Sequence, residues 1–286
     1  MWISKKEMMQ LSEAIKASID VCDGKNIERT EQNDFDIRDN REGAFCILKN
    51  DIYSLICKKN EQIAQLEAER DVLSKYMADI SHQLKTPITS MLIMADLLEN
   101  GAMDKQEEFL CNIKSSLLKM QWLVGALLKM AKLDAMEISF DKRNVRVSEL
   151  LKSVLPSVEI LLDVKNQSLH IEHDEEICCD KKWTVEAMTN IIKNAIEHSP
   201  NGSRLLIDSG NNPLYEWVSV TDCGEGMKKE HYAALFQRFA YSTTENGFGI
   251  GMPLALSIMR GQKGDIDVDF GGNGKGATFI LKFYKA

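Results

Sequence analysis

The strongest constraint on the fold is a long repeat of apolar residues that surrounds one histidine. The repeat advances by threes and fours, with a few polar gaps, through Ile56, Ile63, Leu66, Leu73, Met77, Ile80, Leu84, Met91, Met94 and Leu98. This spacing predicts a long helix that packs along one stripe against another helix. At about 100° per residue, His82 lies about 200° from Ile80, on the face opposite the stripe.

The residues that follow His82 make this part of the helix unusual. Thr86 lies four positions on and shares the face of His82. Pro87 has no backbone N–H and crowds the carbonyl of Gln83, so we expect a bend just after the histidine. Taken alone, these residues would fit an ordinary surface histidine on a coiled coil.

A second helix with the same periodicity follows a predicted stop at Asn100-Gly101. Its apolar residues are Leu110, Ile113, Leu117, Met120, Val124, Leu127 and Ala131. Two such helices joined by a short loop form an antiparallel hairpin. One hairpin cannot cover both apolar stripes, so we expect a homodimer in which two hairpins form a four-helix bundle.

The 286 residues are sufficient for more than one domain, and the sequence pattern divides them into three parts. Residues 50–138 are the predicted helical hairpin, and residues 139–286 have mixed α/β texture. Residues 1–49 are a helical and connector region, for which a degenerate HAMP-like relay module and a plain helical spacer are both open interpretations. The predicted fold class is therefore multidomain, α followed by α/β.

The α/β part alternates short strands with longer helices. Strands are predicted at 145–147, 169–173, 203–209, 217–221, 265–270 and 277–283. Helices are predicted at 148–162, 181–198 and 251–261.

Composition narrows the classes of protein. The formal charge of −8 argues against nucleic-acid binding as the main activity. The seven cysteines are odd in number and contain no C-x-x-C pair, which indicates a reducing compartment. No apolar run is long enough to span a membrane and no signal peptide opens the chain. We therefore expect a cytoplasmic protein as given, or the cytoplasmic part of a membrane-anchored sensor whose transmembrane part is missing.

Two asparagines in the helix predicted at 181–198 suit a magnesium site. Asn190 and Asn194 are four residues apart and lie on one face. Their amide oxygens could hold a Mg²⁺ that keeps several waters and bridges nucleotide phosphates. Plain polar residues on a helix surface are the alternative interpretation.

Three later motifs have the chemistry of a nucleotide site. Asp222-Cys223-Gly224-Glu225-Gly226 ends a predicted strand, where a carboxylate could accept a hydrogen bond from an exocyclic amine of a base. Gly247, Gly249 and Gly251 open a helix, and backbone amides at a helix N-terminus attract phosphate. Arg238, between two phenylalanines, could reach a γ-phosphate.

In order and spacing, these motifs resemble the sensor histidine kinases of two-component signalling, from about residue 75 to the end. In this resemblance His82 is the phosphoacceptor, and Gln83 and Thr86 are its neighbours in the reacting site. The nucleotide-binding set is Asn190, Asn194, His198, Asp222, Gly224, Gly226, Gly247, Gly249, Gly251 and Thr278. Phe236 and Phe239 match the aromatic box beside a flexible lid.

The resemblance implies a phosphotransfer hairpin, a Bergerat-type α/β sandwich that binds ATP and Mg²⁺, and a response-regulator receiver domain as partner. The implied activity is transfer of a phosphoryl group from ATP to His82 and then to an aspartate of the regulator, with regulator phosphatase activity as well. The alternatives are a GHKL-type ATPase, the class of the gyrase and chaperone ATPases, and a non-catalytic ATP-binding dimer scaffold. The ATPases of this class place a glutamate where this chain has Asn190, which cannot act as a base.

Two residues depart from the pattern of the family. Gln83 stands where a carboxylate usually follows the phosphoacceptor, and an amide can hydrogen-bond but cannot accept the imidazole proton. Glu197 stands where many relatives carry a basic residue near the phosphates, a role that His198 could partly fill. These residues leave the balance between kinase and phosphatase open.

Overall fold

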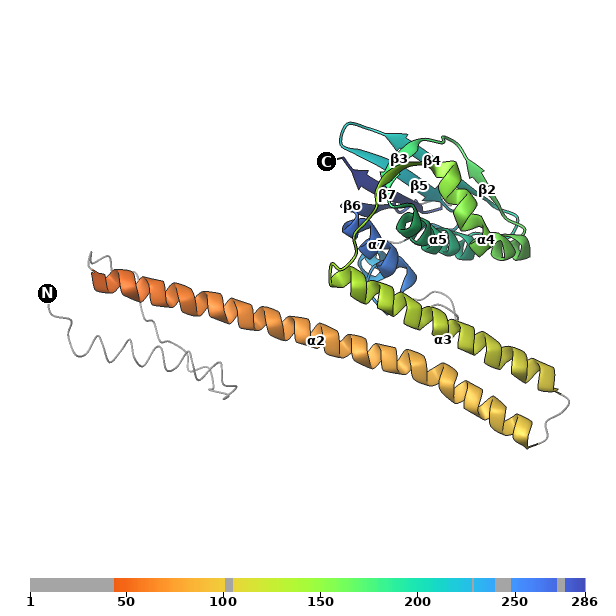
Figure 1. Cartoon of the computed structure of the whole chain (residues 1–286), viewed down its shortest axis with the longest axis horizontal. Helices are drawn as coiled ribbons and strands as arrows, with labels where there is room; N and C mark the ends of the chain where they lie inside the picture. The colour runs from red at the N-terminus through yellow and green to blue at the C-terminus, as the bar shows by residue number, and fades with distance from the viewer. Residues whose placement is uncertain (1–43, 101–104, 228, 240–247, 272–275, 286) are drawn as a thin grey trace. The chain divides into compact units, whose positions relative to one another are not determined.

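The computed structural model describes residues 44–100, 105–227, 229–239, 248–271 and 276–285 (Figure 1). The predicted input region is therefore almost entirely outside the described residues, as is Gly247 of the predicted nucleotide-binding set. By its internal contacts the chain divides into two compact units, residues 1–78 and 79–286. No helix of the described residues is long and apolar enough to cross a membrane.

The first described element is the long helix α2, Ala44–Glu99, which includes Pro87. It ends beside the predicted stop at Asn100, whose side chain donates to the carbonyl of Asp96. The predicted stripe stays partly open to solvent along this helix: Leu66, Leu73 and Met77 are all exposed. The helix thus has the predicted length and period, with apolar side chains that its own chain leaves uncovered.

Helix α3, Gln106–Asp134, completes the helical hairpin and carries two apolar stripes. The predicted stripe includes Leu117 and Val124, which are exposed. The other stripe, Leu123, Ala126 and Met130, is buried and belongs to the hydrophobic core of the following α/β domain. This second stripe was missed by the heptad prediction, because it packs on a helix that lies far along the chain, α7 (Gly251–Gly261).

The α/β domain is built on a five-stranded sheet in the order β2-β4-β5-β7-β6. Its strands are β2 (Ser168–Ile171), β4 (Arg204–Asn211), β5 (Tyr215–Thr221), β6 (Gly264–Asp269) and β7 (Thr278–Tyr284). β2 runs parallel to β4, and the other neighbours are antiparallel. Along β5 and β7, Val218, Val220, Phe279 and Leu281 are fully buried.

Helices α4 (Val147–Lys165), α5 (Lys181–His198) and α7 cover one face of this sheet (Figure 1). α5 packs between α4 and α7. The core between the layers includes Val154, Ile191 and Ile258, one from each helix and each fully buried. The domain is thus an α/β sandwich, as predicted, and α5 lies in the middle of its helical layer.

A small two-stranded sheet pairs β1 (Arg143–Arg146) with β3 (Glu176–Cys179) in antiparallel register. β3 was missed by the sequence analysis. It is only four residues long, and its alternation is carried by Ile177 and Cys179 on the buried side. Between β5 and α7 lie two short helices, the 3₁₀ turn Lys229–His231 and α6 (Tyr232–Leu235).

Candidate functional site

Asp222 follows the end of β5 and is almost fully buried, with 5% of its surface exposed. Its Oδ1 accepts from the backbone N–H groups of Gly224 at 2.8 Å and Ala277 at 3.0 Å. Burial raises the pKa of this carboxyl, whereas these two hydrogen bonds and the charge of His198 lower it. Both bonds use Oδ1, so the carboxylate is held in one orientation while Oδ2 keeps its capacity to accept.

A cavity of about 390 Å³ lies beside this carboxylate. Its lining residues come from the end of β5, the end of β6, the start of β7 and the chain next to these three points: Thr221, Asp222, Cys223, Asp269, Gly271, Gly276 and Thr278. The hydroxyls of Thr221 and Thr278 lie 2.9 Å apart, across paired positions of β5 and β7. The structure therefore brings together Asp222 and Thr278, which the sequence analysis had placed in one site.

Gly276 is required by the close approach of two chain segments at this cavity. A Cβ atom there would collide with the carbonyl oxygen and the Oδ1 of Asp222. A Cβ at Gly224 would come within 2.7 Å of the carbonyl oxygen of His198. Gly276 lines the cavity and lets its backbone lie against Asp222, which suits a flat heterocyclic base, whereas Gly224 lets the Asp222 loop lie against the end of α5.

Asn190 and Asn194 lie on α5, one turn apart, and both are half-buried. Asn190 donates through Nδ2 to the carbonyl of Glu186 at 3.0 Å. Its Oδ1 faces Gly251 at the start of α7, where an added Cβ would lie 3.2 Å away. The predicted phosphate-binding amide and the glycine that opens a helix are thus neighbours in space.

A separate cavity of about 620 Å³ includes Asn190 in its lining. Lys193 and Thr189 of α5 line it as well, with Ser153 of α4 and Trp122 of α3. Asn190 on the phosphate side and Asp222 on the base side of the predicted site therefore line different cavities. From the sequence, Lys193 was not expected here, although its spacing of three from Asn190 places it on a neighbouring face of the same helix.

The segment between α6 and α7 is joined at its two ends. The N–H of Phe239 donates to the carbonyl of Gly249 at 3.1 Å. Phe239 has a φ of 61°, a conformation that is uncommon for a bulky residue, and Gly249 has a φ of 63°. Phe248 stacks on Trp122 of α3, with ring centroids 6.0 Å apart. Phe239, one of the two predicted aromatic residues, and Phe248, which was not predicted, thus lie at the two ends of this segment, and Gly226 before it also has a positive φ, 79°.

Arg238, the predicted γ-phosphate ligand, is bound elsewhere in this structure. Its Nη2 donates to both carboxylate oxygens of Asp134, at 2.8 and 2.7 Å. Asp134 is the last residue of α3. A phosphate-binding role of Arg238 stays a prediction, and it would require this ion pair to open.

His82 lies on α2 and is exposed, as the helical geometry predicted. Thr86 donates through Oγ1 to the carbonyl of His82 at 3.3 Å, so the two lie on adjacent turns of one face. Gln83 is half-buried. Among the described residues, no hydrogen bond or ion pair joins His82 to Asn190 or Asp222, so the acceptor and nucleotide residues form separate parts of the site.

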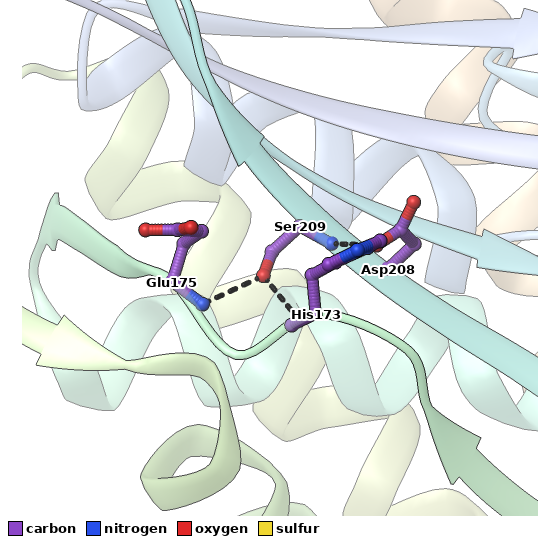
Figure 2. A network of polar contacts seen from close by, with 4 residues as sticks. All are labelled: His173, Glu175, Asp208 and Ser209. Atoms are coloured by element: carbon purple, nitrogen blue, oxygen red, sulfur yellow. Dashed lines mark hydrogen bonds and ion pairs between the residues drawn. The ribbon is translucent and has the colours of Figure 1, made fainter.

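His173, Asp208 and Ser209 have the composition of a catalytic triad but a different geometry. His173 Nδ1 lies 2.8 Å from Asp208 Oδ1, and this contact raises the pKa of the imidazole. Figure 2 shows that Ser209 does not bond to the imidazole: its hydroxyl donates to the backbone carbonyl of His173 and accepts from the N–H of Glu175. The network therefore fastens the turn between β2 and β3 to β4. No cluster of three or more His, Cys, Asp or Glu suited to a metal occurs in the described residues.

Comparison with protein families gives two matches that follow one another along the chain. Residues 72–135 match the His Kinase A (phospho-acceptor) domain. Residues 179–286 match the family of histidine kinase-, DNA gyrase B- and HSP90-like ATPases. The first match includes His82, and the second includes Asn190 and Asp222.

The chain is also similar to named sensor proteins. It is 26% identical over 238 residues to the swarming motility regulation sensor protein RssA of Serratia marcescens, covering 81% of this chain and 50% of the relative. It is 27% identical over 228 residues to the sensor histidine kinase WalK of Bacillus subtilis, covering 73% of this chain and 36% of the relative. The chain thus spans about half, or less, of the length of these relatives.

Among solved structures, the fold is similar to that of the Acinetobacter baumannii histidine kinase AdeS. The TM-score is 0.62 at 22% identity, over 71% of this chain and 97% of the other. Full-length ShkA in complex with AMPPNP gives a TM-score of 0.54 at 23% identity, over 74% of this chain and 46% of the other. These likenesses concern the fold.

Proposed function

The chain belongs to the sensor histidine kinases of two-component systems, and from that premise we propose that it phosphorylates itself on His82. ATP is the phosphoryl donor, and an aspartate of a response-regulator receiver domain is the final acceptor. The observation that carries the proposal is the exposed imidazole of His82 on the hairpin, in a chain that also contains an ATPase-family domain. The proposed domain boundaries are 1–49, 50–138 and 139–286.

His82 acts as the nucleophile in this proposal. The ring nitrogen without a proton forms a bond to the γ-phosphorus, the bond from that phosphorus to the bridging oxygen breaks, ADP leaves, and the proton on the other ring nitrogen passes to water. Gln83 can orient the imidazole by a hydrogen bond but cannot take its proton. Thr86 lies on the same face of the helix, one turn further, beside the incoming phosphoryl group.

The nucleotide is held by groups at the two ends of the site. Asp222 would accept from the exocyclic amine of adenine, and the backbone near Gly224 and Gly276 leaves room for the ring. Asn190, Asn194, Gly249 and the first turn of α7 at Gly251 would bind the phosphate end. Mg²⁺ bound at the two asparagines would neutralise charge on the phosphates. Arg238 would add a further positive charge once released from Asp134.

Net ATP hydrolysis is less well supported. Asn190 has no basic oxygen with which to activate water, and its Nδ2 is occupied by the carbonyl of Glu186. A scaffold without transfer would need no exposed histidine on the hairpin. Both alternatives make different predictions for the products of ATP.

We propose a homodimer for the hairpin, because Leu73, Met77 and Leu117 are exposed on apolar stripes that the chain itself leaves open. We also place the activity in the cytoplasm, as an isolated protein or as part of a membrane-anchored sensor. The free thiols at Cys57, Cys111, Cys178, Cys179 and Cys223 support a reducing compartment.

The test compares the wild type with His82→Ala and with His170→Ala, which removes another exposed histidine. Each protein is incubated with γ-labelled ATP and Mg²⁺, and the bound label is then exposed to acid. We expect acid-labile label on the wild type and on His170→Ala, none on His82→Ala, and equal ATP affinity for all three. Label retained by His82→Ala would remove this residue from the mechanism. Release of free phosphate without label would indicate an ATPase, and neither product would indicate a scaffold.

A further inference from the structure

Two polar side chains, Lys165 at the end of α4 and Gln167 just after it, contact the end of α5. Lys165, the last residue of α4, donates through Nζ to the carbonyls of Ile196 at 2.9 Å, Glu197 at 2.8 Å and Ser199 at 3.2 Å. An ammonium group has three hydrogens, so these three acceptors use all of them. The lysine is half-buried at this point.

Gln167 makes a second set of contacts to the same chain end. Its Nε2 lies 3.3 Å from the carbonyl oxygen of Ile196, 3.1 Å from that of Ser199 and 2.9 Å from that of Pro200. The side chain is buried, and carbonyls only accept, so the NH₂ group must face them. Asn166, between the two donors, has left-handed backbone with a φ of 50° that ends α4. This turn lets both donors face α5.

These contacts meet a physical requirement of α5. The last carbonyls of a helix have no partner within the helix, and they form the negative end of its dipole. Here the positive charge of Lys165 at the end of α4 and the buried amide of Gln167 just after α4 bond to two of these carbonyls, those of Ile196 and Glu197. Charge-assisted bonds of this kind are stronger than neutral ones. The position of the end of α5 is therefore fixed by α4.

The end of α5 also touches the loop that carries Asp222. Ser199 is 3% exposed, and its Oγ accepts from the N–H of Cys223 at 3.0 Å. The carbonyl of His198 lies so close to Gly224 that a Cβ there would come within 2.7 Å of it. Residues 222–224 thus rest on residues 198–199.

We propose that Lys165 and Gln167 are positioning residues for the nucleotide. They hold the end of α5 against the Asp222 loop, and α5 also carries Asn190 and Asn194. The distance between the base-binding carboxylate and the phosphate-binding amides is then set by α4, although α4 contributes no residue to the base-side cavity. The inference rests on the proposed function, because it takes ATP as the ligand of these residues.

The chemistry predicts a specific defect when Lys165 is removed. The Asp222 carboxylate favours the exocyclic amine of adenine and disfavours the carbonyl oxygen that guanine has at that position. A displaced Asp222 loses this discrimination as well as affinity. We expect Lys165→Met to weaken ATP binding by about tenfold and GTP binding by much less, so that the preference for ATP narrows.

The experiment measures the Kd of ATP and of GTP by calorimetry on the full chain, together with the urea midpoint of unfolding. Lys165→Arg keeps a cation that can reach the carbonyls and should restore most of the preference for ATP. Lys152→Met, which removes an exposed lysine from the same helix, should leave both Kd values unchanged. Gln167→Met removes the amide donors. Like Lys165→Met, it should raise the Kd of ATP more than the Kd of GTP, so it tests the inference even if Lys165→Met does not fold.

A folded Lys165→Met or Gln167→Met with a lowered midpoint but wild-type Kd values and ATP preference would overturn the inference. That result would make the contacts a support for stability alone. All proteins in this experiment also carry His82→Ala, so that ATP is bound without phosphoryl transfer and the outcome does not depend on whether His82 is phosphorylated.

Discussion

Gln83 is the residue at which the chemistry of this chain departs most from its family. General base catalysis typically contributes about 10²–10⁴-fold, and an amide cannot supply it. Phosphoryl transfer depends mainly on positioning and on neutralising the phosphate charge, and neither of these needs the missing carboxylate. The loss caused by an amide should therefore fall at or below the bottom of that range.

We predict that Gln83→Glu raises the autophosphorylation rate modestly, with the largest ratio at mildly acidic pH. There the carboxylate can still accept the proton that the amide cannot. Initial rates from pH ~6 to ~8 at saturating Mg·ATP measure the effect. Gln65→Glu, which adds the same charge to an exposed site of the same helix, is the control. If Gln83→Glu is no faster at any pH, Gln83 serves only to orient the imidazole.

His173 gives a second prediction at this scale, about stability and not catalysis. Asp208 raises its pKa in the folded protein, first through the hydrogen bond and then through charge. Because the pKa of His173 is higher in the folded than in the unfolded protein, the protonated imidazole stabilises the folded state. The contribution is complete below the unfolded pKa of about 6.5 and is lost as the pH rises through the folded pKa.

Asp208→Asn should therefore lower the pKa of His173 in an NMR titration. It should also lower the urea midpoint of unfolding more at pH ~6 than at pH ~9. A variant that loses the same amount of stability at both pH values would contradict the linkage.

At the level of single residues, the sequence predicted site residues whose chemical type suits a nucleotide, but it missed residues that only the fold brings to the site. Asp222 and Thr278 were placed in one site because a family pattern joined them, and the pairing of β5 with β7 explains why they meet. Asp269 and Gly271 line the same cavity and were missed, because only the register of β6 against β7 brings them there. Lys165 and Gln167 were missed for the same reason, since they act on a helix end about thirty residues away in sequence.

Among the elements, helices with strong periodicity and clear ends were predicted well. The predicted bounds of α5 and α7, 181–198 and 251–261, agree with those observed. α5 has a clear start because Asp180 caps it by accepting from the N–H of Trp183. β3 has only four residues and pairs with β1 more than thirty residues earlier, so local pattern could not identify it.

The contact between α3 and the segment that follows α6 carries a prediction of its own. The Asp134–Arg238 pair is partly exposed, with 48% and 25% of the two side chains accessible, so we expect it to contribute no more than about 1 kcal/mol. If Arg238 must leave Asp134 to reach the phosphates, Asp134→Asn should raise the autophosphorylation rate by up to about fivefold. Arg238→Ala should lower it.

Glu186→Gln provides the matched control for this prediction. It breaks a different ion pair between α3 and the α/β domain, Lys129–Glu186 at 2.8 Å, without freeing Arg238. Autophosphorylation rates of the three variants at saturating ATP distinguish the release of Arg238 from a separation of the α/β domain from α3. Equal increases in Asp134→Asn and Glu186→Gln would mean that separation from α3, and not the freed guanidinium, controls the rate.

For the whole molecule, the open apolar stripes of the hairpin predict a stable homodimer through residues ~50–135. Leu73 and Met77 are 56% and 59% exposed on the predicted stripe, whereas Leu55, at 66%, lies beside it. We expect sedimentation at micromolar concentration to give a dimer for the wild type and for Leu55→Lys, and a monomer for Leu73→Lys combined with Met77→Lys. A monomeric wild type would contradict the predicted four-helix bundle.

The hydrogen bond between Phe239 and Gly249 has a consequence for how this molecule can vary. It joins Phe239 directly to Gly249, so this closure does not depend on the residues between them. The entropy of closing a flexible ring grows only with the logarithm of its length, and each doubling costs about 0.6 kcal/mol. Length can therefore change there with little penalty in stability, while the backbone at either end, which touches the aromatic contacts and α7, stays in place. Variation in length among related chains is therefore thermodynamically cheap between Phe239 and Gly249, next to a glycine that is proposed to bind phosphate.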